Sequence, residues 1–60
     1  MEAYYVQQEP NRLWYWYGRA VTGEVFAHSM QLFPDAKSCS FDLMLHCVPG
    51  VPVYVLPSLY

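Results

Sequence analysis

The sequence predicts an α+β fold, in which a three-stranded antiparallel meander is followed by one helix on a face of the sheet and then by a C-terminal strand. Three observations predict it. Segments rich in β-forming residues fill the first half of the chain, a stretch without Gly or Pro follows Pro34, and a last β-prone run lies between Pro52 and Pro57. Sixty residues are enough for one domain, which we expect to span residues 1–60.

Residues 3–8 and 12–20 are predicted to form the first two strands, and the second of these segments carries the densest aromatic cluster of the chain. Residues 9–11 (Glu-Pro-Asn) interrupt them and favour a turn. Residues 24–31 are predicted as the third strand. Gly23 precedes it and can adopt the positive φ that a tight hairpin requires. Such short connections join neighbouring strands in antiparallel order.

The helix is predicted over residues 35–47. Pro34 and Asp35 favour a first helical turn, where an acidic side chain faces the positive end of the helix dipole. One apolar face recurs at three- and four-residue spacing and comprises Ala36, Cys39, Leu43 and Cys47. Further apolar residues lie on other faces of the helix: Phe41, Met44 and Leu45. A helix that is apolar on several sides is normally covered on more than one of them.

The final strand is predicted over residues 51–56. Because proline has no N–H to donate to a β-ladder, Pro52 and Pro57 predict that this strand lies at an edge of the sheet or pairs over only part of its length. Val48-Pro49-Gly50 forms the turn between the helix and this strand. The complete order of elements is therefore β-β-β-α-β.

The composition predicts self-association. Hydrophobic residues make up 55% of the chain and charged residues 13%, whereas typical soluble domains have about 45–50% and about 25%. A domain this small hides only about 60% of the surface of its unfolded chain, so we expect a homodimer to cover the excess. The predicted dimer interface comprises apolar residues of the helix and of the last strand: Phe41, Met44, Leu45, Val53, Tyr54 and Val55.

Charge and hydropathy argue against several classes of partner. The formal net charge is −2, and the three basic residues, Arg12, Arg19 and Lys37, are scattered along the chain, too few to neutralise many phosphates of a nucleic acid. The apolar runs are shorter than the ~20 residues of a membrane-spanning helix, and the first residues lack the features of a signal peptide. We therefore expect a cytoplasmic protein without a membrane partner.

We find no recognised catalytic or metal-binding motif in the sequence. Cys39 and Cys47 would lie ~12 Å apart along the helix axis, beyond the ~7 Å that a disulfide tolerates, so we expect two small buried thiols. His28, His46 and the cysteines show no zinc-ligand spacing. We expect His46 to contact helix carbonyls or to be partly buried against the sheet. No metal, cofactor or enzymatic activity is predicted, and a thiol-dependent regulator is a minor alternative.

The order and spacing of these elements resemble the YegP-like family of small β-β-β-α-β domains. The resemblance covers about residues 3–55 and is carried by Trp14-Tyr15-Trp16, by Thr22-Gly23-Glu24-Val25-Phe26-Ala27-His28-Ser29, and by the helix from Asp35 with Val48-Pro49-Gly50 after it. It implies a helix that packs over Trp14 and Trp16 on one face of the sheet. It also implies two subunits, or two tandem repeats, that exchange C-terminal strands to form one continuous sheet. The family brings no established enzymatic activity.

Side chains alternate across a strand, so residues 15 and 17 face away from Trp14 and Trp16. The candidate partner-binding site is the aromatic patch that these residues would form with the third strand on the open face: Tyr15, Tyr17, Phe26 and His28. Tyrosine is a favoured interface anchor; alternatively, a terminal segment or the second copy covers this face. We interpret the chain as a non-catalytic protein-interaction module, of a type that would suit a small bacterial or phage accessory protein that modulates a larger target. The alternative function is a single-stranded nucleic-acid-binding platform on the same aromatic face.

Overall fold

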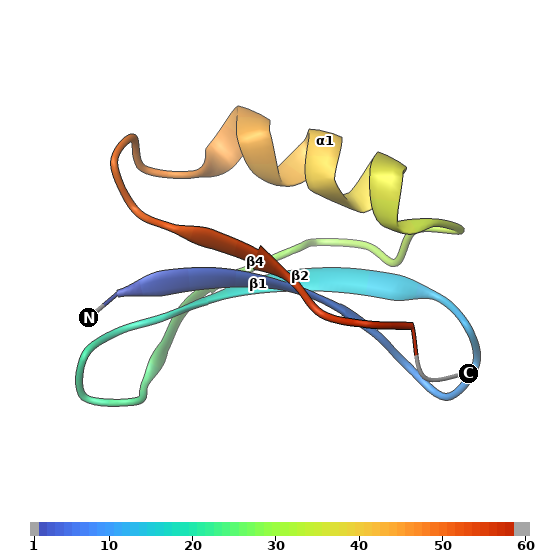
Figure 1. Ribbon diagram of the computed structural model, residues 1–60, viewed down its shortest axis with the longest axis horizontal. Helices are drawn as coiled ribbons and strands as arrows, with labels where there is room; N and C mark the ends of the chain where they lie inside the picture. The colour runs from blue at the N-terminus through green and yellow to red at the C-terminus, as the bar shows by residue number, and fades with distance from the viewer. Residues whose placement is uncertain (1, 59–60) are drawn as a thin grey trace.

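The computed structural model of the protein describes residues 2–58 and has the predicted α+β fold (Figure 1). Three strands come first: β1 (Ala3–Gln8), β2 (Trp14–Arg19) and β3 (Val25–His28). The helix α1 (Ala36–His46) and the short strand β4 (Val53–Val55) complete the order β-β-β-α-β. Each element lies inside the range that the sequence predicts for it, and the differences are confined to the ends.

The four strands form one mixed sheet in the order β3-β2-β1-β4. β1 pairs antiparallel with β2, and β2 with β3, as expected for a meander. β4 lies at the edge, parallel to β1 of the same chain, and α1 is the crossover that returns the chain over one face of the sheet (Figure 1). The edge position that the prolines predict is therefore confirmed. The exchange of this strand with a second copy stays a prediction.

Two tight hairpins join the antiparallel strands. Gly23 has the predicted positive φ, 95°, and its N–H closes the turn between β2 and β3 with a backbone hydrogen bond of 2.9 Å. In the turn between β1 and β2, Arg12 has a φ of 71°, in the left-handed region that a non-glycine residue occupies at an energetic cost. The N–H of Arg12 donates to the carbonyl of Glu9 at 2.8 Å, and the side chain of Asn11 accepts from the N–H of Leu13 at 3.0 Å. These local hydrogen bonds hold the strained residue in place.

Both ends of α1 have a local cause. The carboxylate of Asp35 accepts a hydrogen bond from the N–H of Ser38 at 2.7 Å, which satisfies one of the donors that a first helical turn leaves free. The same hydrogen bond lowers the pKa of Asp35. At the other end, the N–H of Cys47 donates to the carbonyl of Leu43 at 2.8 Å, and Pro49 then prevents a further helical turn.

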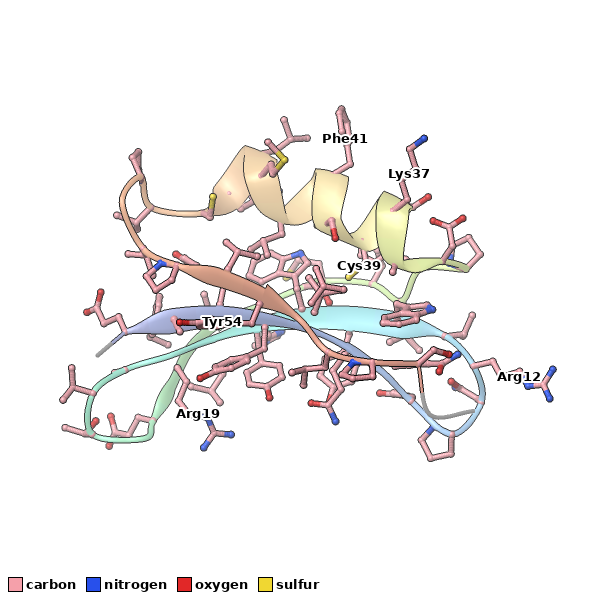
Figure 2. All side chains as sticks on the ribbon, in the orientation of Figure 1. Arg12, Arg19, Lys37, Cys39, Phe41 and Tyr54 are labelled. Atoms are coloured by element: carbon pink, nitrogen blue, oxygen red, sulfur yellow. The ribbon has the colours of Figure 1, made fainter. Side chains whose placement is uncertain are left out.

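The core lies between α1 and one face of the sheet. Every second side chain of β1 and β2 points toward the helix and is buried. The position beneath α1 that the family resemblance implies for Trp14 and Trp16 is confirmed, since their exposed fractions are 8% and 4%. Figure 2 shows Cys39 pointing from α1 toward the sheet. The core residues are Tyr4, Val6, Trp14, Trp16, Phe33, Cys39 and Leu43.

The opposite side of α1 is uncovered in the single chain. Phe41, Met44 and Leu45 are 66%, 73% and 68% exposed, and Phe41 points away from the sheet (Figure 2). The expectation that the helix is covered on more than one side is therefore not met by the chain itself, and this surface stays available to a partner. Among residues 2–58, no helix combines the length and the apolar character that crossing a membrane requires.

Candidate functional site

The open face of the sheet carries a row of aromatic side chains, one from each strand. The register places Tyr17 of β2 opposite Tyr5 of β1 and opposite His28 of β3, and it places Tyr5 opposite Tyr54 of β4. Directly opposed residues of neighbouring strands point to the same face, so the four rings follow one another across the sheet. We refer to His28, Tyr17, Tyr5 and Tyr54 as the aromatic row.

The tyrosines of the aromatic row stack on one another. The ring centroids of Tyr5 and Tyr17 are 5.3 Å apart and those of Tyr5 and Tyr54 are 5.7 Å apart, with an interplanar angle of 27° in both pairs. Tyr15 stacks on Tyr17 from the same strand, at 5.7 Å and 25°. The hydroxyl of Tyr17 donates to Oε1 of Gln7 at 3.1 Å. Stacking and this hydrogen bond therefore hold the rings in place in the free protein.

Arg19 lies beside the aromatic row and adds a positive charge to it. Its guanidinium carbon lies 5.6 Å from the ring centre of Tyr17, which is a cation–π contact.

Partial burial, and in smaller measure Tyr17 and Glu9, raise the pKa of Tyr15, so this phenol is neutral at physiological pH and can donate a hydrogen bond. The face is hollowed here by a shallow cavity of about 420 Å³, lined by Gln7, Tyr15, Tyr17, Arg19, Val25 and His28.

Phe26 does not belong to this face, and its predicted place in the aromatic patch is wrong. Its ring contacts the ring of Tyr4 on the helix side of the sheet, with centroids 5.5 Å apart. It also fills the space beside Gly18, where an added Cβ would lie 2.7 Å from the phenylalanine ring. The cause is a β-bulge next to Gly18, which breaks the alternation that would put Phe26 and His28 on one face. The other predicted residues do lie together on the open face: Tyr15, Tyr17 and His28.

Tyr5 and Tyr54 are members of the aromatic row that sequence reasoning does not assign to the site. Tyr4 and Tyr5 are adjacent and identical, so alternation alone leaves open which of them faces the helix. The signal that decides it is the register of the first hairpin, which pairs Tyr5 with Tyr17. The sequence predicts Tyr54 as a dimer residue, and its stacking on Tyr5 adds it to the row.

The predicted dimer residues are exposed and come from two elements. Phe41, Met44 and Leu45 belong to the exposed part of α1. The other three make up the whole of β4 at the edge of the sheet, with exposed fractions of 42%, 50% and 55% for Val53, Tyr54 and Val55 respectively. Both groups therefore remain accessible to a second copy.

A second group of polar and aromatic side chains lies between α1 and β2. The indole N–H of Trp16 donates to Oδ2 of Asp42 at 2.8 Å. The ring of His46 stacks on Trp16 with centroids 6.1 Å apart, and its Nε2 lies 3.8 Å from Oδ1 of Asp42. The hydrogen bond satisfies the polar atom of a buried indole, so these contacts have a structural role. Within residues 2–58, no three His, Cys, Asp or Glu side chains are placed to hold a metal ion.

The two cysteines differ in their surroundings, and both are free. Cys39 is buried under α1, and desolvation, with a smaller contribution from Asp42, raises its pKa to about 11. Cys47 is half-buried at the end of the helix, where its thiol donates to the carbonyl of Met44 at 3.9 Å. A thiol that is protonated at neutral pH is a poor nucleophile, so the surroundings of Cys39 do not favour the thiol-dependent alternative.

Comparison with known proteins adds no assignment. No family model matches the chain, and neither a curated protein nor a solved structure matches it. The resemblance to the YegP-like family therefore stays a prediction, and function has to be argued from the site.

Proposed function

We propose that the protein is a non-catalytic interaction module that binds a protein partner through the aromatic row. The observation that carries this proposal is the stacked set of tyrosines on a sheet face over which the described chain places no second layer (Figure 1). Tyrosine combines apolar area with a hydroxyl group, and it is enriched among the residues that dominate the energetics of interfaces. Rings that are already held in place also lose little conformational entropy on binding.

The proposal includes a homodimer in the cytoplasm. The exposed apolar side of α1 and the exposed β4 support self-association, because a small domain gains stability when a partner covers such surface. The free thiols of Cys39 and Cys47 suit a reducing compartment. The small size, the acidity and the absence of a catalytic motif suit a bacterial or phage accessory protein that modulates a larger target.

Single-stranded nucleic acid is the second candidate partner, because bases stack on the aromatic side chains of sheets. The distribution of charge disfavours it. Arg19 lies at the aromatic row, whereas Arg12 lies at the turn between β1 and β2 and Lys37 lies on the outer side of α1 (Figure 2). These are all the lysines and arginines of the chain, and they form no cationic groove for a phosphate backbone.

Capture of the partner tests the proposal. The tagged protein and its Tyr5→Ser/Tyr17→Ser variant serve as baits in an extract of the source cells. Leu45→Ser is the matched control, because it removes an exposed apolar side chain from the outer side of α1. We expect the same partner with the protein and the control, and roughly tenfold less with the double variant. Circular dichroism confirms that the variants are folded, and a partner retained by the double variant would contradict the proposal.

Fluorescence anisotropy with labelled single-stranded oligonucleotides separates the two candidates. We expect no binding even at low salt, because few phosphates can be neutralised. Salt-sensitive binding that is lost in both Tyr15→Ala and Tyr17→Ala would replace the protein partner with a nucleic acid at the same face.

A further inference from the structure

Within residues 2–58, the outer edge of β4 presents backbone groups without a hydrogen-bond partner at two residues. The carbonyl of Pro52 and the N–H of Leu56 each form a hydrogen bond of 2.9 Å with β1. In a strand, the backbone groups of successive residues point alternately to the two sides, so residues 52, 54 and 56 face β1. The N–H and C=O groups of Val53 and Val55 therefore point outward, away from the sheet.

Charge does not protect this edge. Edge strands of natural proteins usually carry charged side chains that prevent pairing with another chain, but the sequence has no Asp, Glu, Lys or Arg after Asp42. Pro57 is the next residue whose backbone would point outward, and it has no N–H to donate. The free edge is thus short and neutral, and Pro57 limits further pairing at its C-terminal end.

The aromatic row stops at the same edge. Tyr5 lies between Tyr17 and Tyr54 and stacks on both of them. Tyr54 stacks on Tyr5 alone among the described tyrosines, and its other side faces the edge, where the residue is half exposed. An aromatic side chain on an added strand would give Tyr54 the second neighbour that Tyr5 already has.

The helix side of β4 is open and apolar as well. α1 packs over β1 and β2, and its residue Asp42 faces Trp16 of β2. Met44 follows Asp42 by about 200° around the helix, so it projects from the opposite flank, the one nearer to β4. Together with Val53 and Val55, Met44 makes this flank of the molecule apolar.

We propose that β4 pairs antiparallel with β4 of a second copy, about a two-fold axis at Tyr54. In this register Val53 lies opposite Val55 of the partner subunit, and Val55 lies opposite Val53 of the partner subunit. Both are hydrogen-bonded pairs, so every outward N–H of the two strands meets an outward carbonyl. A shift by two residues would leave only one of these two residues with a counterpart inside the other β4. Tyr54 then lies opposite Tyr54 of the partner subunit at the closer, non-hydrogen-bonded spacing.

The available surface suits a dimer of modest affinity. β4 with its backbone edge and Met44 offers roughly 500 Å² per copy, if a large side chain presents about 150–200 Å² when fully exposed. If all of this surface were covered, two copies would bury roughly 1,000 Å², the lower limit for a specific interface. We accordingly expect dissociation at micromolar concentrations and not a permanent dimer.

The pairing deepens the proposed function and rests on it, because the second copy would complete the partner-binding site. Two aromatic rows would meet at Tyr54 and form a single row twice as long. A protein partner would then contact two symmetry-related half-sites. The pairing also keeps the contact between β4 and β1 within each chain, whereas strand exchange would replace it.

A charge placed on the edge tests the pairing. Val55→Lys adds the kind of residue that protects natural edge strands. Val21→Lys is the matched control, because Val21 is exposed in the turn between β2 and β3, which β1 separates from β4. In sedimentation velocity at increasing concentration, we expect the protein and the control to form dimers, and the dissociation constant of Val55→Lys to rise roughly tenfold or more. A protein that stays monomeric throughout, or a control that dissociates as much as Val55→Lys, overturns the pairing.

Cysteine cross-linking tests the register independently of stability. In a Cys47→Ser background, Tyr54→Cys should form an interchain disulfide on mild oxidation, because the opposed Cα atoms would lie about 4.5 Å apart. Val53→Cys should cross-link much more slowly, because its counterpart would lie two residues, about 7 Å, further along the strand. Equal or faster cross-linking of Val53→Cys overturns the register.

The two proposals fail in distinguishable ways. If the protein is monomeric but captures a partner that Tyr5→Ser/Tyr17→Ser loses, the pairing is wrong and the interaction function stands. If the edge dimer forms but substitution of the aromatic row leaves capture unchanged, the pairing stands and the interaction function is wrong.

Discussion

The two faces of the sheet are built from the same kinds of residue and differ in what covers them. Along β2, Trp14 and Trp16 point toward α1, while Tyr15 and Tyr17 point to the open side. The tryptophans are almost completely buried, whereas the tyrosines cover one another only in part. The position of a single helix thus assigns two aromatic rings of one strand to the core and two to the surface.

The polar atoms of these rings also differ in where their hydrogen-bond partners lie. The indole N–H of Trp16 is bonded to a carboxylate of α1, whereas the hydroxyl of Tyr17 is bonded to Gln7 on the open face. An unpaired polar group is costly only where water is excluded. We therefore expect the covered face to determine stability and the open face to determine binding. Matched substitutions on the two faces test this distinction.

The largest difference is expected for the two leucines on opposite sides of α1. Leu43 is fully buried, so Leu43→Ala should lower the free energy of unfolding by about 2–5 kcal/mol through lost burial and a residual cavity. Leu45 is exposed, so Leu45→Ala should change it by no more than about 0.5 kcal/mol. Denaturant unfolding followed by tryptophan fluorescence measures both. Equal losses would show that a second layer buries the outer side of α1 in solution. The outer side of α1 would then count, like the helix side of the sheet, as a covered face that determines stability.

An intermediate difference is expected for hydrogen-bonding aromatic residues on the two faces of β2. Trp16→Phe leaves a smaller ring and removes the donor that Asp42 accepts from, so it should cost about 1–3 kcal/mol. Tyr17→Phe removes one hydroxyl on the open face and should cost about 1 kcal/mol or less. Thermal and denaturant unfolding give both values. A larger loss for Tyr17→Phe would mean that the open face contributes to folding as well as to binding.

The effect with the narrowest range of conditions is expected from the titration of Cys39, because it appears only in alkaline solution. Its pKa of about 11 in the folded protein lies above the value of about 8.5 for an unfolded chain. The stability that this difference contributes is complete below the unfolded value and is lost as the pH rises through the folded one. Between about pH 9 and 11, stability should therefore fall more steeply for the protein than for Cys39→Ala, with Cys47→Ala as control. Parallel curves for all three would contradict the burial of the Cys39 thiol.

Local chemistry explains why the elements could be predicted from the sequence. The hairpin at Gly23, the helix start at Asp35 and the edge position of β4 each depend on residues within a few positions of the feature. The buried side of β2 also follows from alternation once the helix is placed over the tryptophans. The order β-β-β-α-β and the two faces of β2 are therefore within reach of sequence reasoning.

The candidate site could be predicted only in part, because it depends on how strands align. Tyr15, Tyr17 and His28 were within reach through alternation on β2 and β3. Tyr5 depends on the register between β1 and β2, which adjacent tyrosines leave undetermined. The face on which Phe26 lies depends on a bulge between β2 and β3, which no residue of β3 indicates. The alignment of one strand against the next is thus what composition and spacing fail to show.

Gly18 and Phe26 form a packing unit that spans two strands. Gly18 is a helix-facing position of β2 without a side chain, and the bulge turns Phe26 into the space that this leaves against Tyr4. An alanine at position 18 would place its Cβ 2.7 Å from the Phe26 ring and 2.8 Å from that of Tyr4. In evolutionary terms, the two positions should vary together: relatives with a larger residue at 18 should have a smaller one at 26, with a regular β2–β3 ladder in place of the bulge.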